Sequence, residues 1–96
     1  DNSNKKTNRN NWKDHQEKKL KMSYKEQREF ETIDADIAAL EDAIAEVETQ
    51  INRAGSNYTR LQELSAERER LTASLDEKME RWVYLNDLAE KIEAQT

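Results

Sequence analysis

The stretch FETIDADIAALEDAIAEVETQI, residues 30–51, decides the fold of this chain. Its large apolar residues lie alternately three and four positions apart; they are Phe30, Ile33, Ile37, Leu40, Ile44, Val47 and Ile51. This heptad spacing is typical of a helix that packs along one face against a partner helix. The stretch predicts an all-α coiled coil, and it does not indicate what the coiled coil does.

The chain provides the partner helix itself, because a break follows at Ala54–Asn57. Gly55 can adopt the left-handed conformation that ends a helix, and Ser56 or Asn57 can cap the next one. After this break a new heptad frame fits the apolar residues better than the old one; it runs through Leu61, Leu64, Arg68, Leu71, Leu75, Lys78, Trp82, Leu85, Ala89 and Ile92. The sequence therefore predicts a two-helix antiparallel coiled-coil hairpin.

The boundaries of the hairpin can be predicted from local signals. Ser23-Tyr24-Lys25-Glu26 fits the S-x-x-E capping box, so the first helix is expected to cover residues 24–53. A turn at 54–57 and a second helix at 58–95 complete a domain of residues 20–96. Facing residues should have numbers that sum to 111 or 112, which pairs Phe30 with Trp82. By the same register, Leu20, Met22 and Tyr24 should pack onto the end of the second helix.

Composition supports one small helical domain. The chain has 96 residues, 39% of them charged and 34% hydrophobic, with one Gly, no Pro and no Cys. The absence of Cys excludes disulfides and thiolate metal sites. We find no apolar run long enough to span a membrane and no signal-peptide core, so a cytoplasmic location is expected.

The first 19 residues differ in composition from the rest of the chain. They are rich in Asn and Lys and contain Trp12 as their only large apolar residue, so we predict a disordered basic linker to a further domain. Residues 1–22 carry seven basic and three acidic side chains, whereas residues 23–96 carry nine basic and eighteen acidic ones. This asymmetry fits a segment that faces a polyanion, and it equally fits a solvated linker.

No catalytic constellation is present in the sequence. The single histidine, His15, lies in the linker, and one Gly is too few for a phosphate-binding loop. The carboxylates are spread over solvated helix faces near basic residues, where they support the helices. We therefore predict that this chain is not an enzyme and that it holds no cofactor and no metal.

Two clusters of basic residues are candidate nucleic-acid contacts. The larger one lies at the base of the hairpin, the open end opposite the turn; its members are Lys18, Lys19, Lys21, Tyr24, Lys25, Arg28, Arg81 and Lys91. A secondary contact at the tip, beside the turn, consists of Arg53 and Arg60. The basic side chains could bind phosphates, and a tyrosine could stack on a base. The alternative is that they only neutralise an acidic body and that Tyr24 belongs to the core.

The sequence KMSYKEQREFE, residues 21–31, resembles the K-L-S-Y-K-E-Q-R-E-L-E run that opens the C-terminal domain of the ABC-F family of ATPases, most closely its Uup branch. Arg81-Trp82 and Leu85 resemble the R-W-x-x-L that closes the coiled coil of that family. The resemblance covers about residues 20–92. It implies an antiparallel hairpin that follows the second ATPase cassette. In this family the hairpin is expected to bind DNA or ribosomal RNA, and the cassettes to hydrolyse ATP.

We expect a non-catalytic C-terminal coiled-coil domain that binds DNA or ribosomal RNA. Its expected partners also include the ATPase cassettes of its parent chain. The acidic character of residues 23–96 is unfavourable for contact along the whole hairpin, so the base, the linker or the tip is favoured. The alternative is a protein-interaction or spacer arm that docks a partner helix or self-associates. The chain is expected to be a monomer or a weak dimer, and the sequence does not separate DNA from RNA as the ligand.

Overall fold

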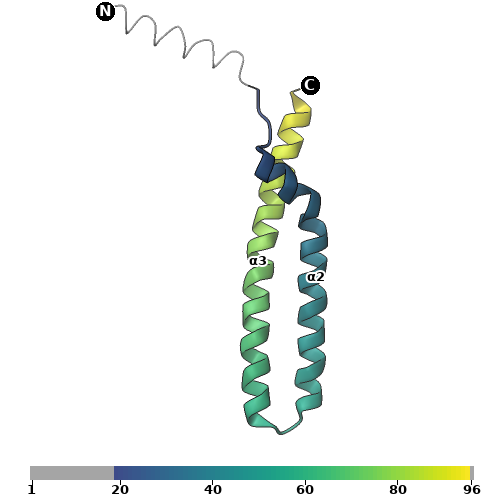
Figure 1. Cartoon of the computed structure of the whole chain (residues 1–96), viewed down its shortest axis with the longest axis vertical. Coiled ribbons are helices and arrows are strands. Elements are labelled where there is room, and N and C mark those ends of the chain that lie inside the picture. The colour runs from purple at the N-terminus through teal and green to yellow at the C-terminus, as the bar shows by residue number, and fades with distance from the viewer. Residues whose placement is uncertain (1–18, 96) are drawn as a thin grey trace, which may run out of the picture.

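The computed structural model describes residues 19–95, which form two helices joined by a short turn (Figure 1). Helix α2 spans Tyr24–Ala54 and helix α3 spans Tyr58–Ala94. They lie side by side in opposite directions, so the all-α hairpin is confirmed. At 1.5 Å per residue the helices are about 46 Å and about 56 Å long. Residues 1–18, which hold most of the expected linker, lie outside the described residues.

The start of α2 is a capping box, as its sequence predicts. The Ser23 hydroxyl oxygen accepts a hydrogen bond from the Glu26 backbone N–H at 3.1 Å, and Glu26 Oε1 accepts one from the Ser23 N–H at 2.9 Å. These bonds occupy two donors that would otherwise have no partner in the first turn of a helix. The start of α2 is therefore fixed by Ser23, just before the helix, and by Glu26 in its first turn.

The turn between the helices depends on its glycine. Gly55 has φ 59° and ψ −119°, a conformation that is strained for any residue with a side chain. The backbone N–H of Asn57 donates to the carbonyl oxygen of Ala54 at 3.1 Å. The side-chain oxygen of Asn57 then accepts from the Arg60 N–H at 3.0 Å and caps α3. Gly55 and Asn57 therefore fold the chain back over a very short turn.

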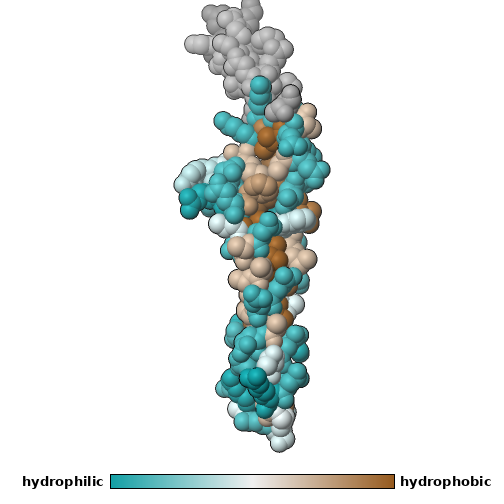
Figure 2. Space-filling view, turned by 90° about the vertical axis from the view of Figure 1, so that its right-hand side faces the viewer, coloured by the Kyte–Doolittle hydropathy of each residue, from teal (hydrophilic) through white to brown (hydrophobic). Residues whose placement is uncertain are grey.

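The core is thin because only two helices enclose it. Among residues 19–95, five apolar side chains are buried, each at most 9% exposed; they are Ile33, Val47, Leu64, Leu85 and Leu88. Most other residues of the predicted seam, such as Ile37 and Leu71, are half-buried. Figure 2 shows the result, a narrow hydrophobic band along the long axis between hydrophilic flanks. Neither helix in the described part of the chain contains an apolar stretch that could cross a bilayer.

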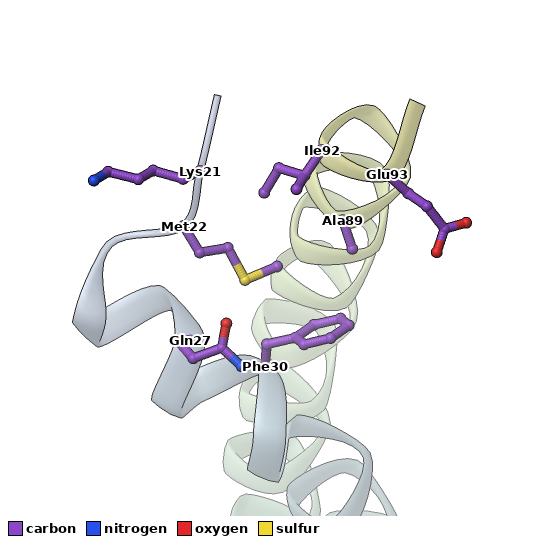
Figure 3. A pocket seen from close by; sticks show the side chains of 7 residues that line it. All are labelled: Lys21, Met22, Gln27, Phe30, Ala89, Ile92 and Glu93. Carbon is purple, nitrogen blue, oxygen red and sulfur yellow. The ribbon is translucent and has the colours of Figure 1, made fainter. Parts of the chain in front are cut away.

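The base of the hairpin differs from the expected register at Trp82. Trp82 is 41% exposed, and its indole N–H donates to Asp34 Oδ1 at 2.8 Å. Phe30 lines a groove together with Met22 and with Ala89 of α3 (Figure 3), and its expected contact with Trp82 stays a prediction. Trp82 itself lies at the edge of the seam and not within it. The physical reason is the indole N–H, which finds a carboxylate acceptor at the flank of the seam that it would lack within the seam.

The segment before α2 packs only partly as expected. The Leu20 backbone N–H donates to Gln95 Oε1 at 3.2 Å, and the Gln95 amide donates to the Leu20 carbonyl oxygen. Met22 is half-buried against the end of α3. Tyr24, however, is 77% exposed, so the expectation that it packs onto α3 is wrong. Its place in the first turn of α2 directs it to solvent.

Candidate nucleic-acid interface

Arg81, one of the expected nucleic-acid contacts, is held in a contact between the two helices. Its Nε donates to Glu29 Oε2 at 2.9 Å and its Nη2 donates to Glu29 Oε1 at 2.7 Å. The guanidinium carbon lies 4.8 Å from the ring centroid of Tyr84, within the range of a cation–π contact. Tyr84 Oη in turn donates to Glu26 Oε2 at 2.6 Å. Glu26, Glu29, Arg81 and Tyr84 thus form one polar cluster that joins α2 to α3.

The ionisation of this cluster follows from its hydrogen bonds. The Tyr84 hydroxyl, together with the Ser23 N–H, lowers the pKa of Glu26 below its ordinary value, and the Arg81 guanidinium lowers the pKa of Glu29. The same contacts raise the pKa of Arg81 and of Tyr84. At neutral pH both carboxylates and the guanidinium are therefore charged. The positive charge of Arg81 is matched by Glu29 and is poorly placed to bind a phosphate.

Two further basic residues of α3 have acidic partners. Lys91 lies 3.0 Å from Asp87 one turn earlier on the same helix, and Lys78 lies 3.1 Å from Asp36 of α2. Lys91 was expected to join the nucleic-acid site at the base. Like Arg81, Lys91 already has a carboxylate partner with which a phosphate would have to compete. Its part in a nucleic-acid site stays a prediction.

The remaining basic residues of the predicted base cluster are exposed and close together in the chain. Within residues 19–95 no ion pair forms on Lys19, Lys21, Lys25 or Arg28. Figure 3 shows Lys21 extending away from α3 into solvent. Tyr24 lies between Lys21 and Lys25 in the sequence and is 77% exposed. We call Lys19, Lys21, Tyr24, Lys25 and Arg28 the basic segment; Lys18, also predicted here, lies outside the described residues.

The tip offers less free positive charge than the base. Arg60 Nη2 donates to Gln50 Oε1 at 2.9 Å, and Nη1 lies 3.6 Å from Glu63. Arg53 is exposed and has no ion pair within the described part of the chain. Tyr58 is 71% exposed, with its hydroxyl accepting from Gln62 at 3.3 Å. The tip therefore presents one unpaired cation and one exposed ring.

An apolar groove lies at the base beside the basic segment. It has a volume of about 440 Å³ and is lined by Met22, Phe30, Ala89 and Ile92, with polar side chains at its edges (Figure 3). In residues 19–95 no group of three or more His, Cys, Asp or Glu side chains is arranged to hold a metal ion. The groove is open to solvent, and apolar side chains line its centre.

Sequence reasoning missed the acidic partners of the base, above all Glu29 and Asp34. The signal was present for the first of them, because Glu29 and Arg81 have numbers that sum to 110, as do Glu26 and Tyr84. This sum is close to the predicted 111 or 112, so applying the register to polar residues would have placed the two members of each pair within one or two positions of facing each other. No such signal exists for Asp34 and Trp82, whose numbers sum to 116.

Comparison with known proteins gives a family match over most of the hairpin. The family model of the ABC transporter C-terminal domain matches residues 21–87. An uncharacterized ABC transporter ATP-binding protein of Bacillus subtilis (strain 168), YfmR, is 38% identical over 77 residues, which cover 80% of this chain and 12% of that protein. The chain therefore spans about an eighth of the length of this curated relative. No solved structure matches the chain.

Proposed function

We propose that this chain, which belongs to the ABC transporter C-terminal domain family, binds nucleic acid through the basic segment at the base of its hairpin. The family match assigns it to a C-terminal, non-catalytic domain of an ABC transporter ATP-binding protein. Nucleic-acid binding, the ATP-binding cassettes of a parent chain as partners, a cytoplasmic location and membership of the Uup branch are our proposals beyond that match.

The observation that carries the proposal is the contrast among the basic residues. Lys19, Lys21, Lys25 and Arg28 are exposed without acidic partners in the described residues, whereas Arg81, Lys78 and Lys91 each have one. An unpaired cation can release a counterion from a phosphate without first breaking an ion pair, so these four supply the electrostatic part of binding. Only one acidic residue, Glu26, lies between Lys19 and Arg28.

Tyr24 adds a contact that lysine and arginine do not provide. Tyr24 is 77% exposed, so it is not buried in the hairpin. A base that stacks on an exposed aromatic ring contributes about 1–3 kcal/mol in proteins that bind single strands. Tyr24 is therefore the residue that would favour unpaired bases in a loop or single strand over a regular duplex. The acidic middle of the hairpin would keep the ligand at this end.

Titration of labelled duplex DNA and of a labelled RNA stem-loop at several salt concentrations tests this function. Phosphate contacts give a slope of about −0.9 in log affinity against log salt per contact on duplex DNA. We expect the triple variant Lys21→Glu, Lys25→Glu and Arg28→Glu to flatten that slope by about three units. Circular dichroism should show an unchanged helix content. Binding of the triple variant with the affinity and slope of the unmodified chain would refute the proposal.

Tyr24→Ala separates stacking from charge in the same titration. If Tyr24 stacks on unpaired bases, this variant should weaken binding to the RNA stem-loop about tenfold while leaving the salt slope unchanged. Tyr58→Ala at the tip is the matched control, because Tyr58 is similarly exposed. Equal losses for the two variants would mean that Tyr24 has no special place in the site.

A further inference from the structure

A second exposed surface lies on α3. It is apolar, whereas the basic segment is positively charged. Met79 is 50% exposed, Trp82 41% and Val83 61%. Trp82 and Val83 follow Met79 by three and four positions, so the three residues lie next to one another on the surface of one helix. Large apolar residues so placed on the outside of a helix stay in contact with water unless a partner covers them.

Four of the residues around this apolar surface are acidic, and the nearby Lys78 and Arg81 are paired with carboxylates of α2. Two carboxylates precede Val83 on the helix, Asp76 by seven positions and Glu80 by three. Two more follow it, Asp87 by four positions and Glu90 by seven. All four are exposed, and only Asp87 has an ion pair within the described residues, with Lys91. Positions at these intervals share the helix face of Val83. The apolar surface therefore has an acidic rim.

The charge of this rim selects among possible occupants. A nucleic acid or an anionic membrane would be repelled by this rim, because three of its four carboxylates have no ion pair in the described residues. A second copy of the chain, docked through the same face, would bring its own acidic rim against this one. A protein helix with apolar residues at three- and four-residue intervals and Lys or Arg on either side would complement both the apolar centre and the rim.

We propose that the surface of Met79, Trp82 and Val83 docks an amphipathic helix of a protein partner whose rim is basic. This surface is distinct from the proposed nucleic-acid site, which is formed by the start of α2 and the residues before it. The hairpin would then bind two partners of opposite charge, a polyanion at the basic segment and a basic helix on α3. Neither binding requires the other.

A labelled helical peptide with Leu at i, i+3, i+4 and i+7 and Lys elsewhere is the probe, with a Leu and Glu peptide of the same pattern as its control. Fluorescence polarisation should show binding of the Lys peptide and none of the Glu peptide. The double variant Met79→Ser and Val83→Ser should weaken binding about tenfold or more, because both side chains would be central anchors. Tyr58→Ser, an equally exposed residue at the start of α3, should change nothing.

Met79 and Val83 are apolar side chains at least half exposed to solvent, so the double variant should keep the fold, which circular dichroism checks. It should also leave nucleic-acid binding unchanged, so the two proposals fail separately. Equal binding of the Lys peptide to the double variant and to the unmodified chain would overturn the inference. Sedimentation that reveals a dimer abolished by the double variant would overturn it too, because a second copy would then be the occupant.

Discussion

The two ends of the hairpin are built from the same heptad pattern but are held together differently. At the base, four polar contacts join α2 to α3: Glu26 to Tyr84, Glu29 to Arg81, Asp34 to Trp82 and Asp36 to Lys78. Towards the tip, the described residues show one such contact, between Gln50 and Arg60, and the other ion pairs lie within α3. The apolar seam thus brings the helices together along their length, while directional contacts fix the register chiefly at the base.

The polar contacts of the base also determine which of its basic side chains are paired and which are not. Basic residues of the base that face the other helix are used in its polar contacts, and those on the outside, in the basic segment, are left for a ligand. At the tip the single turn fixes the geometry, so few side chains are needed there. A domain that is anchored at one end and closed by a short turn at the other can present distinct surfaces without a large core.

The largest expected effect comes from removing a buried residue at the base. Leu85 is 0% exposed, so Leu85→Ala should lower the free energy of unfolding by about 2–5 kcal/mol. Leu61→Ala, at a half-buried seam position near the tip, should cost less because less area leaves the core. Thermal and urea unfolding followed by circular dichroism measure both. Equal losses would show that the base is no better packed than the tip.

The next effect belongs to the turn. Gly55→Ala has open space for its methyl group, since nothing lies within 4 Å of the position that a Cβ would occupy, but the positive φ of 59° strains any residue with a side chain. We expect a loss of about 1–3 kcal/mol in the free energy of unfolding. Asn52→Ala, an exposed position in the last turn of α2, is the control and should change stability little. An undiminished stability for Gly55→Ala would mean that the turn relaxes at no cost.

The smallest effect concerns the polar contacts and depends on pH. The pKa of Glu29 is lowered from its ordinary value of 4.5, so its ion pair with Arg81 stabilises the fold above that value and ceases to do so as the pH falls through the lowered pKa. The stability difference between the unmodified chain and Glu29→Gln should therefore be present at neutral pH and should vanish in acid. Glu67→Gln, whose partner Arg70 is on the same helix, serves as the tip control. A difference that persists at low pH would rule out the ionic origin.

The elements of the fold could be predicted from the sequence because the deciding signals are local. Ser23 and Glu26 define the start of α2, Gly55 defines the turn, and the spacing from Phe30 to Ile51 defines the apolar face. Each of these acts through a few neighbouring residues. The predicted ends of the helices, at 53 and 95, differ from the observed ends by one residue each.

The candidate site was predicted less well because it depends on pairs that are distant in the chain. Arg81 and Glu29 lie 52 positions apart, and the heptad frames, which included Arg68 and Lys78 beside the apolar residues, did not pair acidic with basic side chains across that distance. Heptad position also gave Trp82 a place in the seam but did not include the hydrogen bond that its indole N–H requires. Tyr24 was assigned to the end of α3 by register alone, although its position in the first turn of α2 leaves it exposed.

The central claim, that the unpaired cations of the base bind nucleic acid, is tested most directly by two charge-matched variants. Lys25→Glu with Arg28→Glu changes the base, and Arg53→Glu with Arg68→Glu makes the same change in net charge towards the tip, where both arginines are exposed and have no ion pair in the described residues. The measurement is the salt dependence of duplex DNA binding for each variant. We expect the base variant to flatten the slope by about two units and the tip variant to keep the slope of the unmodified chain. The opposite outcome, a flattened slope for the tip variant alone, would contradict it.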